Sequence, residues 1–351
     1  MHKAIRSIRV AVAATTLLAG AAAAQSVDLN GAGATFPYPI YSKWFADYAT
    51  KTGVKINYPS IGSGGGIRQL SEQTVDFGAS DSPMSDQELA NAKGGPVLHF
   101  PTVMGAVVIT YNIPGVAKPL NLSGDVIADI FSGKITKWND ARIVAQNRGA
   151  ALPNSDILVV HRSDGSGTTY IFSDYLSAVS PSWSSTLGKA KEIKWPVGLG
   201  GKGNEGVAGQ VSQTPNSIGY VELAYAKQNK LRYANVKNAA GRYVTPTIGS
   251  VTAAASGIKL PKNTDYRVSI VNAPGKDSYP ISSMTWILVY KNQLDRAKGQ
   301  KLIDFLRWAY TSGEKSAESL DYAPLPPAMR AQLERRLASI SLGGTQVGAA
   351  R

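Results

Sequence analysis

The chain has 351 residues, a length that suits two domains, and 43% of its residues are hydrophobic while 17% are charged, which excludes a disordered protein. It has no cysteine, which excludes disulfide scaffolds, thiolate-bound zinc, cysteine-held iron–sulfur clusters, cysteine nucleophiles and a lipid anchor on cysteine. Three histidines exclude a histidine-rich metal site, and the formal net charge of +13 favours a negatively charged partner or a plain basic surface.

The N-terminus has the pattern of a cleavable leader. Residues 3–9 carry three basic side chains, residues 10–18 are apolar but too few to span a bilayer, and Ala21–Ala24 supply the small side chains that a signal peptidase accepts. We expect a signal peptide of residues 1–24, cleaved before Gln25, and an exported, soluble protein. Exported proteins rarely meet nucleic acid, and the Lys and Arg residues are dispersed, so no nucleic-acid partner is expected. The excess of basic residues is explained either by binding of a small anion or by a solvated basic surface without a function.

The remaining chain alternates short apolar strands with helices that carry apolar stripes, which is typical of α/β proteins. Two apolar extended segments flank a middle part rich in Lys, Gly, Pro and Asn, and they are candidates for crossings between two lobes. In chain order, the predicted elements are strand Val27–Asn30, a helix that buries residues between Ile40 and Tyr48, strand Val54–Tyr58, a helix that carries Ile67 and Leu70, strand Val75–Ala79, a helix capped by Ser85 and Glu88, extended segment Pro101–Tyr111, strand Ile157–Val160, a helix from Ile171 to Val179, extended segment Ile281–Tyr290, and helix Gln300–Tyr310.

Loops of small residues follow three of these strands, and each loop opens a helix. They are Gly31–Phe36 (GAGATF), Gly62–Gly66 (GSGGG) and Ser163–Thr168 (SDGSGT). Free N–H groups and the helix dipole favour an anion at a helix N-terminus, and the C-terminal ends of strands are where α/β sheets bind ligands. The loops add hydroxyl donors and a guanidinium fork that matches a tetrahedral oxyanion, from Thr35, Ser63, Ser166, Thr168 and Arg162. The loops therefore predict an anion site.

Asp81 directly follows the apolar strand VDFGAS and has two interpretations. Its carboxylate is either the cap of a turn or helix, or a negative group beside the bound anion. The second arrangement is favourable only if the anion carries a proton that the carboxylate can accept.

Other functional motifs fail on inspection. GSGGG lacks the Lys-Ser/Thr of a P-loop, and the G-x-G-x-x-G match at Gly198–Gly203 has no good strand before it, so no dinucleotide site is expected. Ser166 lacks the glycine two residues earlier that a nucleophile elbow needs. His161 is expected to be a structural histidine facing the other side of its strand, and no pair of carboxylates is arranged for acid–base catalysis.

Long stretches of the chain resemble one protein family, in order and over nearly the whole length after the leader. They are GAGATFPYPIY (Gly31–Tyr41), GSGGG, VDFGASDSPMSD (Val75–Asp86), RSDGSGTTYIF (Arg162–Phe172), KWPVGLGGKGNEGVAG (Lys194–Gly209), SIGYVELAYAKQN (Ser217–Asn229) and DYAPLP (Asp321–Pro326). The chain resembles the periplasmic phosphate-binding proteins of high-affinity phosphate ABC transporters.

The resemblance implies a set of site residues. The implied phosphate ligands are Thr35, Phe36, Ser63, Asp81, Arg162, Ser166, Gly167 and Thr168, with Asp164 holding Arg162 in place. Gly64 stands where the family often has a second serine, so a contact from that hydroxyl is in doubt. No catalytic residue, metal or cofactor is implied.

The resemblance also implies a two-lobed α/β binding protein of the type II flytrap kind, with two crossings between the lobes. We expect residues 25–103 plus 281–345 in one lobe, 104–280 in the other, and a disordered tail at 346–351. The expected function is capture of inorganic phosphate in the periplasm by a monomer, followed by delivery to the membrane permease subunits of an ABC transporter with a cytoplasmic ATPase. A binding protein for sulfate or molybdate, or a secreted phosphatase, is the alternative.

Overall fold

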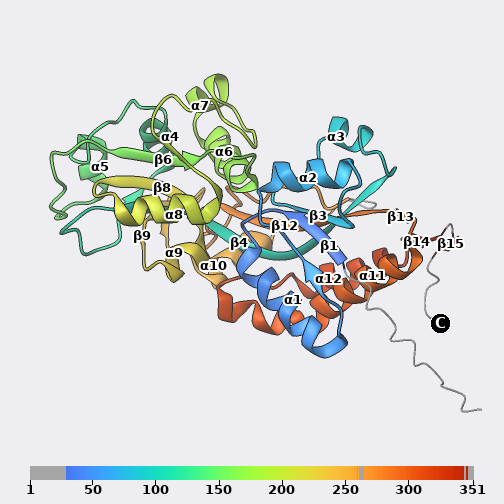
Figure 1. Ribbon diagram of the computed structural model, residues 1–351. Helices are drawn as coiled ribbons and strands as arrows, with labels where there is room; N and C mark the ends of the chain where they lie inside the picture. The colour runs from blue at the N-terminus through green and yellow to red at the C-terminus, as the bar shows by residue number, and fades with distance from the viewer. Residues whose placement is uncertain (1–28, 259, 261–264, 344, 347–351) are drawn as a thin grey trace, which may run out of the picture.

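A nine-stranded mixed sheet runs through the molecule and joins its two lobes (Figure 1). The computed structural model describes residues 29–258, 260, 265–343 and 345–346. The strands are β1 (Leu29–Gly33), β2 (Ile56–Asn57), β3 (Phe77–Ser80), β4 (Val97–Asn112), β5 (Asn121–Leu122), β6 (Leu158–Arg162), β7 (Leu199–Gly201), β8 (Ser217–Glu222), β9 (Arg232–Tyr233), β10 (Asn235–Lys237), β11 (Tyr243–Val244), β12 (Ser282–Tyr290), β13 (Asn292–Gln293), β14 (Ser341–Leu342) and β15 (Thr345–Gln346).

Helices cover this sheet in both lobes (Figure 1). They are α1 (Tyr38–Thr52), α2 (Ser63–Ser71), α3 (Asp86–Ala90), α4 (Gly124–Phe131), α5 (Ala141–Gln146), α6 (Gly167–Val179), α7 (Pro181–Thr186), α8 (Gly203–Gln213), α9 (Leu223–Gln228), α10 (Ile248–Ala255), α11 (Arg296–Thr311) and α12 (Pro327–Leu337), with 3₁₀ turns η1 (Gly313–Ser316) and η2 (Glu318–Leu320). None of the helices in the described part of the chain combines the length and the apolar character needed to cross a membrane.

The long strand β4 connects the two lobes. The sheet order is β2-β1-β3-β12-β4-β8-β6-β7, with β9 also paired to β4. Residues 97–106 of β4 pair antiparallel with β12, and residues 107–112 pair antiparallel with β8. We call the part built on β1, β3 and β12 the first lobe and the part built on β6 and β8 the second lobe.

Both predicted crossing segments lie at this junction. Pro101–Tyr111 falls within β4, and Ile281–Tyr290 coincides with β12 and the residue before it. The two segments run side by side, because the Val107 N–H donates to the Ile281 carbonyl at 2.9 Å. Each of these β-strands is buried almost throughout, which explains their continuous apolar sequence.

Apolar stripes position the helices as their spacing predicts. On α1, the five residues of the stripe are buried against the sheet of the first lobe: Ile40, Tyr41, Trp44, Phe45 and Tyr48. In the second lobe, Phe172 of α6 stacks on Tyr220 of β8 with ring centroids 4.3 Å apart. The predicted capping box of α3 is also present, since Ser85 and Glu88 exchange hydrogen bonds.

The prediction of a loop at Gly62–Gly66 is wrong beyond its first residue, because α2 already begins at Ser63. Gly66 allows this helix to pack closely on the sheet. A Cβ atom at Gly66 would lie 2.6 Å from Gly33 Cα and 2.7 Å from the Ala79 carbonyl oxygen, so only glycine permits this approach.

Several predicted boundaries also shift by a few residues. The predicted strand Val54–Tyr58 is reduced to Ile56–Asn57, and Gln346 lies in β15 and not in a disordered tail. The predicted signal peptide of residues 1–24 and residues 347–351 of the predicted tail lie outside the described residues.

Candidate functional site

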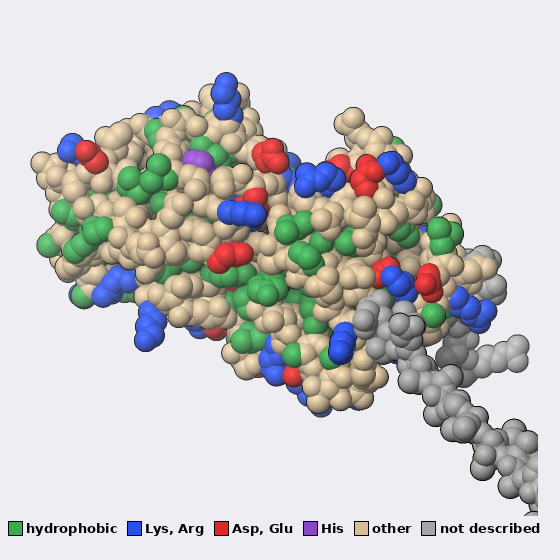
Figure 2. Space-filling view, viewed as in Figure 1, with side chains coloured by type: hydrophobic (Ala, Val, Ile, Leu, Met, Phe, Trp, Pro, Cys, Tyr) green, Lys and Arg blue, Asp and Glu red, His purple; other side chains and the backbone are tan. Residues whose placement is uncertain are grey.

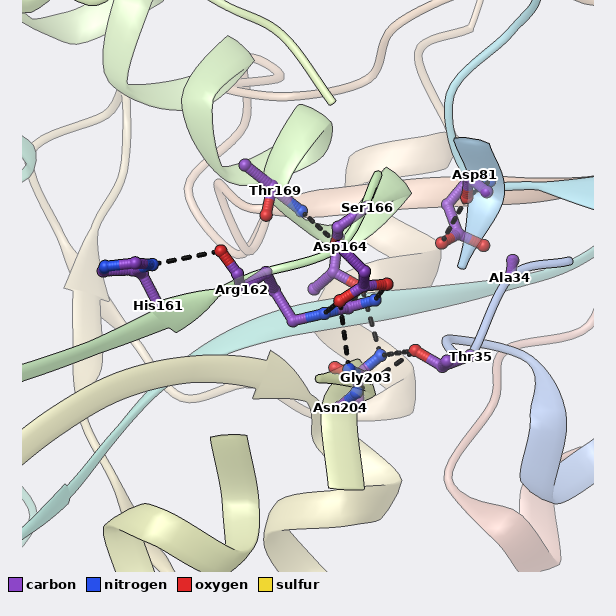
Figure 3. A network of polar contacts seen from close by, with 12 residues as sticks. Ala34, Thr35, Asp81, His161, Arg162, Asp164, Ser166, Thr169, Gly203 and Asn204 are labelled. Carbon is purple, nitrogen blue, oxygen red and sulfur yellow. Dashed lines mark hydrogen bonds and ion pairs between the residues drawn. The ribbon is translucent and has the colours of Figure 1, made fainter. Parts of the chain in front are cut away.

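The segments that follow β1, β2 and β6 meet where the two lobes face each other, together with Asp81 at the end of β3. Figure 3 shows Thr35, Asp81 and Arg162 from three of these places. The Gly64 N–H of the first lobe donates to the Gly165 carbonyl of the second lobe at 2.8 Å. Gly167 lies against the first lobe, because a Cβ atom there would lie 2.4 Å from Ser63 Oγ and 2.6 Å from Asp81 Oδ2. The structure therefore brings the three predicted loops together in a closed arrangement.

Arg162 supplies a buried positive charge at the end of β6. Its side chain is 1% exposed, and its guanidinium holds Asp164 through Nε–Oδ1 and Nη2–Oδ2 contacts of 2.7 and 2.5 Å. Nη1 donates to Thr168 Oγ1 at 3.2 Å. Burial alone would raise the pKa of Asp164, but the hydrogen bonds and charge of Arg162 outweigh it and lower that pKa below its ordinary value. The pair is therefore ionised, and the planar fork has a fixed direction.

Asp81 lies opposite, at the end of β3, and is 1% exposed. Its Oδ1 accepts from Thr285 Oγ1 at 2.7 Å, its Oδ2 is 3.4 Å from Ser63 Oγ, and its N–H donates to Ser63 Oγ at 3.1 Å. Burial raises the pKa of Asp81 to about 7, against the opposing effects of Thr285, Arg162 and Ser63. Within the described residues, the carboxylate accepts its hydrogen bonds from hydroxyl groups, which is not the arrangement of a turn cap.

Thr35 and Phe36 occupy the loop between β1 and α1, and both are buried. Thr35 Oγ1 accepts from the backbone N–H and from Nδ2 of Asn204, at 3.2 and 2.7 Å. The Phe36 carbonyl accepts from the Tyr322 hydroxyl at 2.6 Å, which leaves the N–H of Phe36 as its polar group for a ligand.

Helix N-termini also converge on the site. Helix α2 begins at Ser63, α6 begins at Gly167, and α8 begins at Gly203. Ser166 caps α6, since its Oγ accepts from the Thr169 N–H at 3.0 Å, and its hydroxyl proton stays available. N–H groups of the first helical turn and the positive ends of the dipoles make this a favourable place for an anion.

His161 takes no part in this arrangement. Its Nδ1 lies 3.0 Å from the Arg162 carbonyl oxygen, and its ring stacks on Trp195 with centroids 4.8 Å apart. Figure 3 shows the imidazole set apart from Ser166, with Arg162 between them. Burial lowers the pKa of His161 below its ordinary value. These contacts describe a structural histidine and do not assemble a Ser–His catalytic pair.

Sequence reasoning missed some of the residues that shape the site. Asn204 links Thr35 to Thr168, and Tyr225 donates to the Thr35 carbonyl at 2.6 Å. Thr285 of β12 holds Asp81. Asn204 and Tyr225 lie within KWPVGLGGKGNEGVAG and SIGYVELAYAKQN, two of the stretches that carry the family resemblance, and this position was the only indication of a role that the sequence offered for them. No motif indicated a role for Thr285, because its contact with Asp81 arises from the pairing of β12 with β3.

An open groove of about 930 Å³ lies beside the site, and Figure 2 shows the surface hollowed between the two lobes. Residues 82–86 of the first lobe and Tyr170 of the second lobe line it. Lys191 and Glu88 form an ion pair across it, with Nζ and Oε1 2.6 Å apart.

Comparisons with known proteins agree with this architecture. A family described as "PBP superfamily domain" matches residues 19–312. The phosphate-binding protein PstS of Xylella fastidiosa (strain 9a5c) is 48% identical over 316 residues, which cover 90% of this chain and 86% of that protein. The phosphate-binding protein PstS of Pasteurella multocida (strain Pm70) is 48% identical over 303 residues, covering 86% of this chain and 87% of that protein.

A solved structure shares the fold. PfluDING, a high-affinity periplasmic phosphate-binding protein determined with bound phosphate, superposes with a TM-score of 0.73 at 24% identity, covering 91% of this chain and 97% of that one. The family match and the identity to relatives along most of the length settle the classification: the chain belongs to the PBP superfamily and, within it, to the family of the PstS phosphate-binding proteins.

Proposed function

We propose that this protein captures inorganic phosphate between its lobes and delivers it to the membrane permease subunits of an ABC importer with a cytoplasmic ATPase. The observation that carries this proposal is the composition of the closed site. A buried guanidinium, helix N-termini and hydroxyl groups supply donors, while one buried carboxylate supplies an acceptor. This combination suits a tetrahedral oxyanion that still carries a proton.

In this proposal each predicted site residue has a chemical role. Asp81 accepts a hydrogen bond from the P–OH group, Arg162 neutralises the anion, and Asp164 keeps Arg162 in position. The remaining groups donate to phosphate oxygens: the hydroxyls of Thr35, Ser63, Ser166 and Thr168, and the backbone N–H groups of Phe36, Gly167 and Thr168.

The proposal includes phosphate-driven closure of the lobes, with residues 25–103 plus 281–345 in one and 104–280 in the other. Contacts such as Gly64–Gly165 and Tyr225–Thr35 join the lobes. A ligand that contacts both lobes binds the closed state best and so shifts the population toward it. Small-angle scattering should show a smaller radius of gyration with phosphate, and the double variant Ser166→Ala/Thr168→Ala should abolish the change. An equal radius with and without phosphate in the unmodified protein would contradict closure.

We also propose that the chain acts as a monomer in the periplasm after cleavage before Gln25, and that it is not an enzyme. The role of Ser166 Oγ as a helix cap and the position of His161 away from it support the last point. Titration calorimetry with phosphate tests the binding function, with one phosphate per chain as the expected result. Release of product from a chromogenic phosphate monoester would instead favour a phosphatase, and tighter binding of sulfate or molybdate would change the ligand.

A further inference from the structure

Asn204 is the second residue of α8 and is fully buried between the lobes. Its Nδ2 donates to Thr35 Oγ1 of the first lobe at 2.7 Å and to Thr168 Oγ1 of the second lobe at 3.1 Å (Figure 3). Its backbone N–H also donates to Thr35 Oγ1, at 3.2 Å. One amide therefore contacts a hydroxyl from each lobe.

The direction of this amide is fixed by its other end. Asn204 Oδ1 accepts from the Glu222 N–H at 2.9 Å, and a backbone N–H can only donate. Glu222 is the last residue of β8 and pairs with Val107 of β4, so the amide is anchored to the sheet that joins the lobes. Nδ2 must then face the two threonines, and its two protons match their two oxygens.

These contacts decide what the hydroxyls can do. A hydroxyl has one proton to donate and two lone pairs that accept. Thr35 Oγ1 accepts both Asn204 contacts, so its lone pairs are occupied. Thr168 Oγ1 accepts from Arg162 Nη1 and from Asn204 Nδ2, so its lone pairs are occupied as well. Each hydroxyl keeps its proton as the group left for a ligand.

We propose that Asn204 is a positioning residue that makes Thr35 and Thr168 obligatory hydrogen-bond donors, one from each lobe, toward the bound oxyanion. This inference rests on the proposed function. It explains why an amide serves here: the residue must offer two donors toward the site and one acceptor toward Glu222, which neither a carboxylate nor an aliphatic side chain provides.

The test is a double-mutant cycle on phosphate affinity. Asn204→Leu keeps the size of the side chain but removes the amide, and we expect its Kd for phosphate to rise about 10- to 100-fold. In a Thr35→Val/Thr168→Val background the same substitution should change Kd by less than about threefold, because the groups it acts on are gone. A purely structural role would give equal losses in both backgrounds, which would overturn the proposal.

A matched control uses another buried asparagine of the second lobe. Asn147 directly follows α5, and its side chain forms hydrogen bonds with the backbone of Asn121 and with the Ile143 carbonyl. Asn147→Leu should lower the unfolding temperature and leave the phosphate Kd unchanged. If Asn147→Leu weakens phosphate binding as much as Asn204→Leu does, general destabilisation explains the loss of affinity and the proposal fails.

Neutron diffraction of the deuterated, unmodified protein with phosphate tests the same point without any variant. Both threonine deuterons should point at phosphate oxygens, and a deuteron directed at the Asn204 amide would overturn the proposal. If the unmodified protein does not bind phosphate, the proposed function itself fails. If it binds phosphate and Asn204→Leu binds it equally well, only the positioning role fails.

Discussion

Gly167, the first residue of α6, lies directly against Asp81 of the opposite lobe, and a Cβ atom at Gly167 would lie 2.6 Å from Asp81 Oδ2. Side-chain atoms do not tolerate that distance, so the two lobes approach this closely only because position 167 has no side chain. The contact ties an acceptor of the first lobe to the helix N-terminus of the second.

Gly167→Ala should therefore prevent full closure and raise the Kd for phosphate by about 10²-fold or more, while each lobe still folds. Alanine favours a helix, so the unfolding temperature should not fall. Gly209→Ala in α8 is the control, because a Cβ atom there meets nothing within 4 Å. Titration calorimetry and thermal unfolding measure both effects, and an unchanged Kd for Gly167→Ala would show that closure does not need this contact.

Arg162→Ala should weaken phosphate binding by about 2–5 kcal/mol, or roughly 30- to 4,000-fold in Kd, because it removes the buried charge partner of the anion. Arg162→Lys keeps the charge but not the fork and should give an intermediate loss. Arg68→Ala on the exposed side of α2 is the control, with the unmodified Kd expected. Calorimetry that finds unmodified affinity for Arg162→Ala would remove this residue from the site.

Selectivity against sulfate should depend on pH through Asp81, whose pKa burial raises to about 7. Above that pH the carboxylate only accepts hydrogen bonds and repels a fully deprotonated sulfate oxygen. As the pH falls through about 7, Asp81 gains a proton and becomes a donor, so sulfate affinity should increase. Asp81→Asn should bind sulfate with little change over the same range. Sulfate titrations from about pH 6 to pH 9 measure this, and a flat profile for the unmodified protein would be the contrary result.

The free energy of unfolding of the ligand-free protein should also depend on pH through Asp81. Asp81 has a raised pKa in the folded protein and an ordinary one near 3.8 in the unfolded chain, so between these values the folded protein binds more protons. Its contribution to the free energy of unfolding is therefore full below about pH 4 and is lost as the pH rises to about 7. Urea unfolding of the unmodified protein and of Asp81→Asn across this window should show a steeper decline for the unmodified protein. Parallel declines would contradict a buried, titrating Asp81.

The ion pair between Lys191 and Glu88 crosses the groove and should slow phosphate release. Its side chains are 22% and 27% exposed, so solvent screens it only in part. Lys191→Met should raise the dissociation rate of phosphate about two- to fivefold, and high salt should reduce the difference. Lys189→Met is the matched control, because Lys189 pairs with Asp174 within the second lobe. Stopped-flow release rates that are equal for both variants would exclude a role for the pair across the groove.

Local sequence patterns predicted several of the secondary-structure elements well. The stripe of α1, the capping box of α3 and the apolar runs of β4 and β12 all appear as expected, because each depends on burial or bonding between near neighbours. The GSGGG segment was wrongly predicted to be a loop. Its Gly66 is required by close contact with β1 and β3, which a local pattern does not show.

The polar contacts between residues far apart in the chain could not be predicted from their spacing. Asn204 meets Thr35, and Asp81 meets Thr285, only because the order of strands in the sheet brings distant parts of the chain together. The roles of the loop residues came from the family resemblance, which named them without giving the hydrogen bonds that orient them. The structure supplies those bonds, and the ligand roles stay a prediction.

A competition titration tests the central claim most directly. Phosphate is titrated into the unmodified protein at about pH 8, with and without millimolar sulfate, where Asp81 is mainly ionised. While Asp81 is ionised, the site offers no donor at this position to an anion that lacks a proton, and it binds that anion much more weakly than phosphate. The phosphate Kd should therefore be the same in both titrations. A sulfate-dependent rise in that Kd would contradict recognition of phosphate through the carboxylate of Asp81.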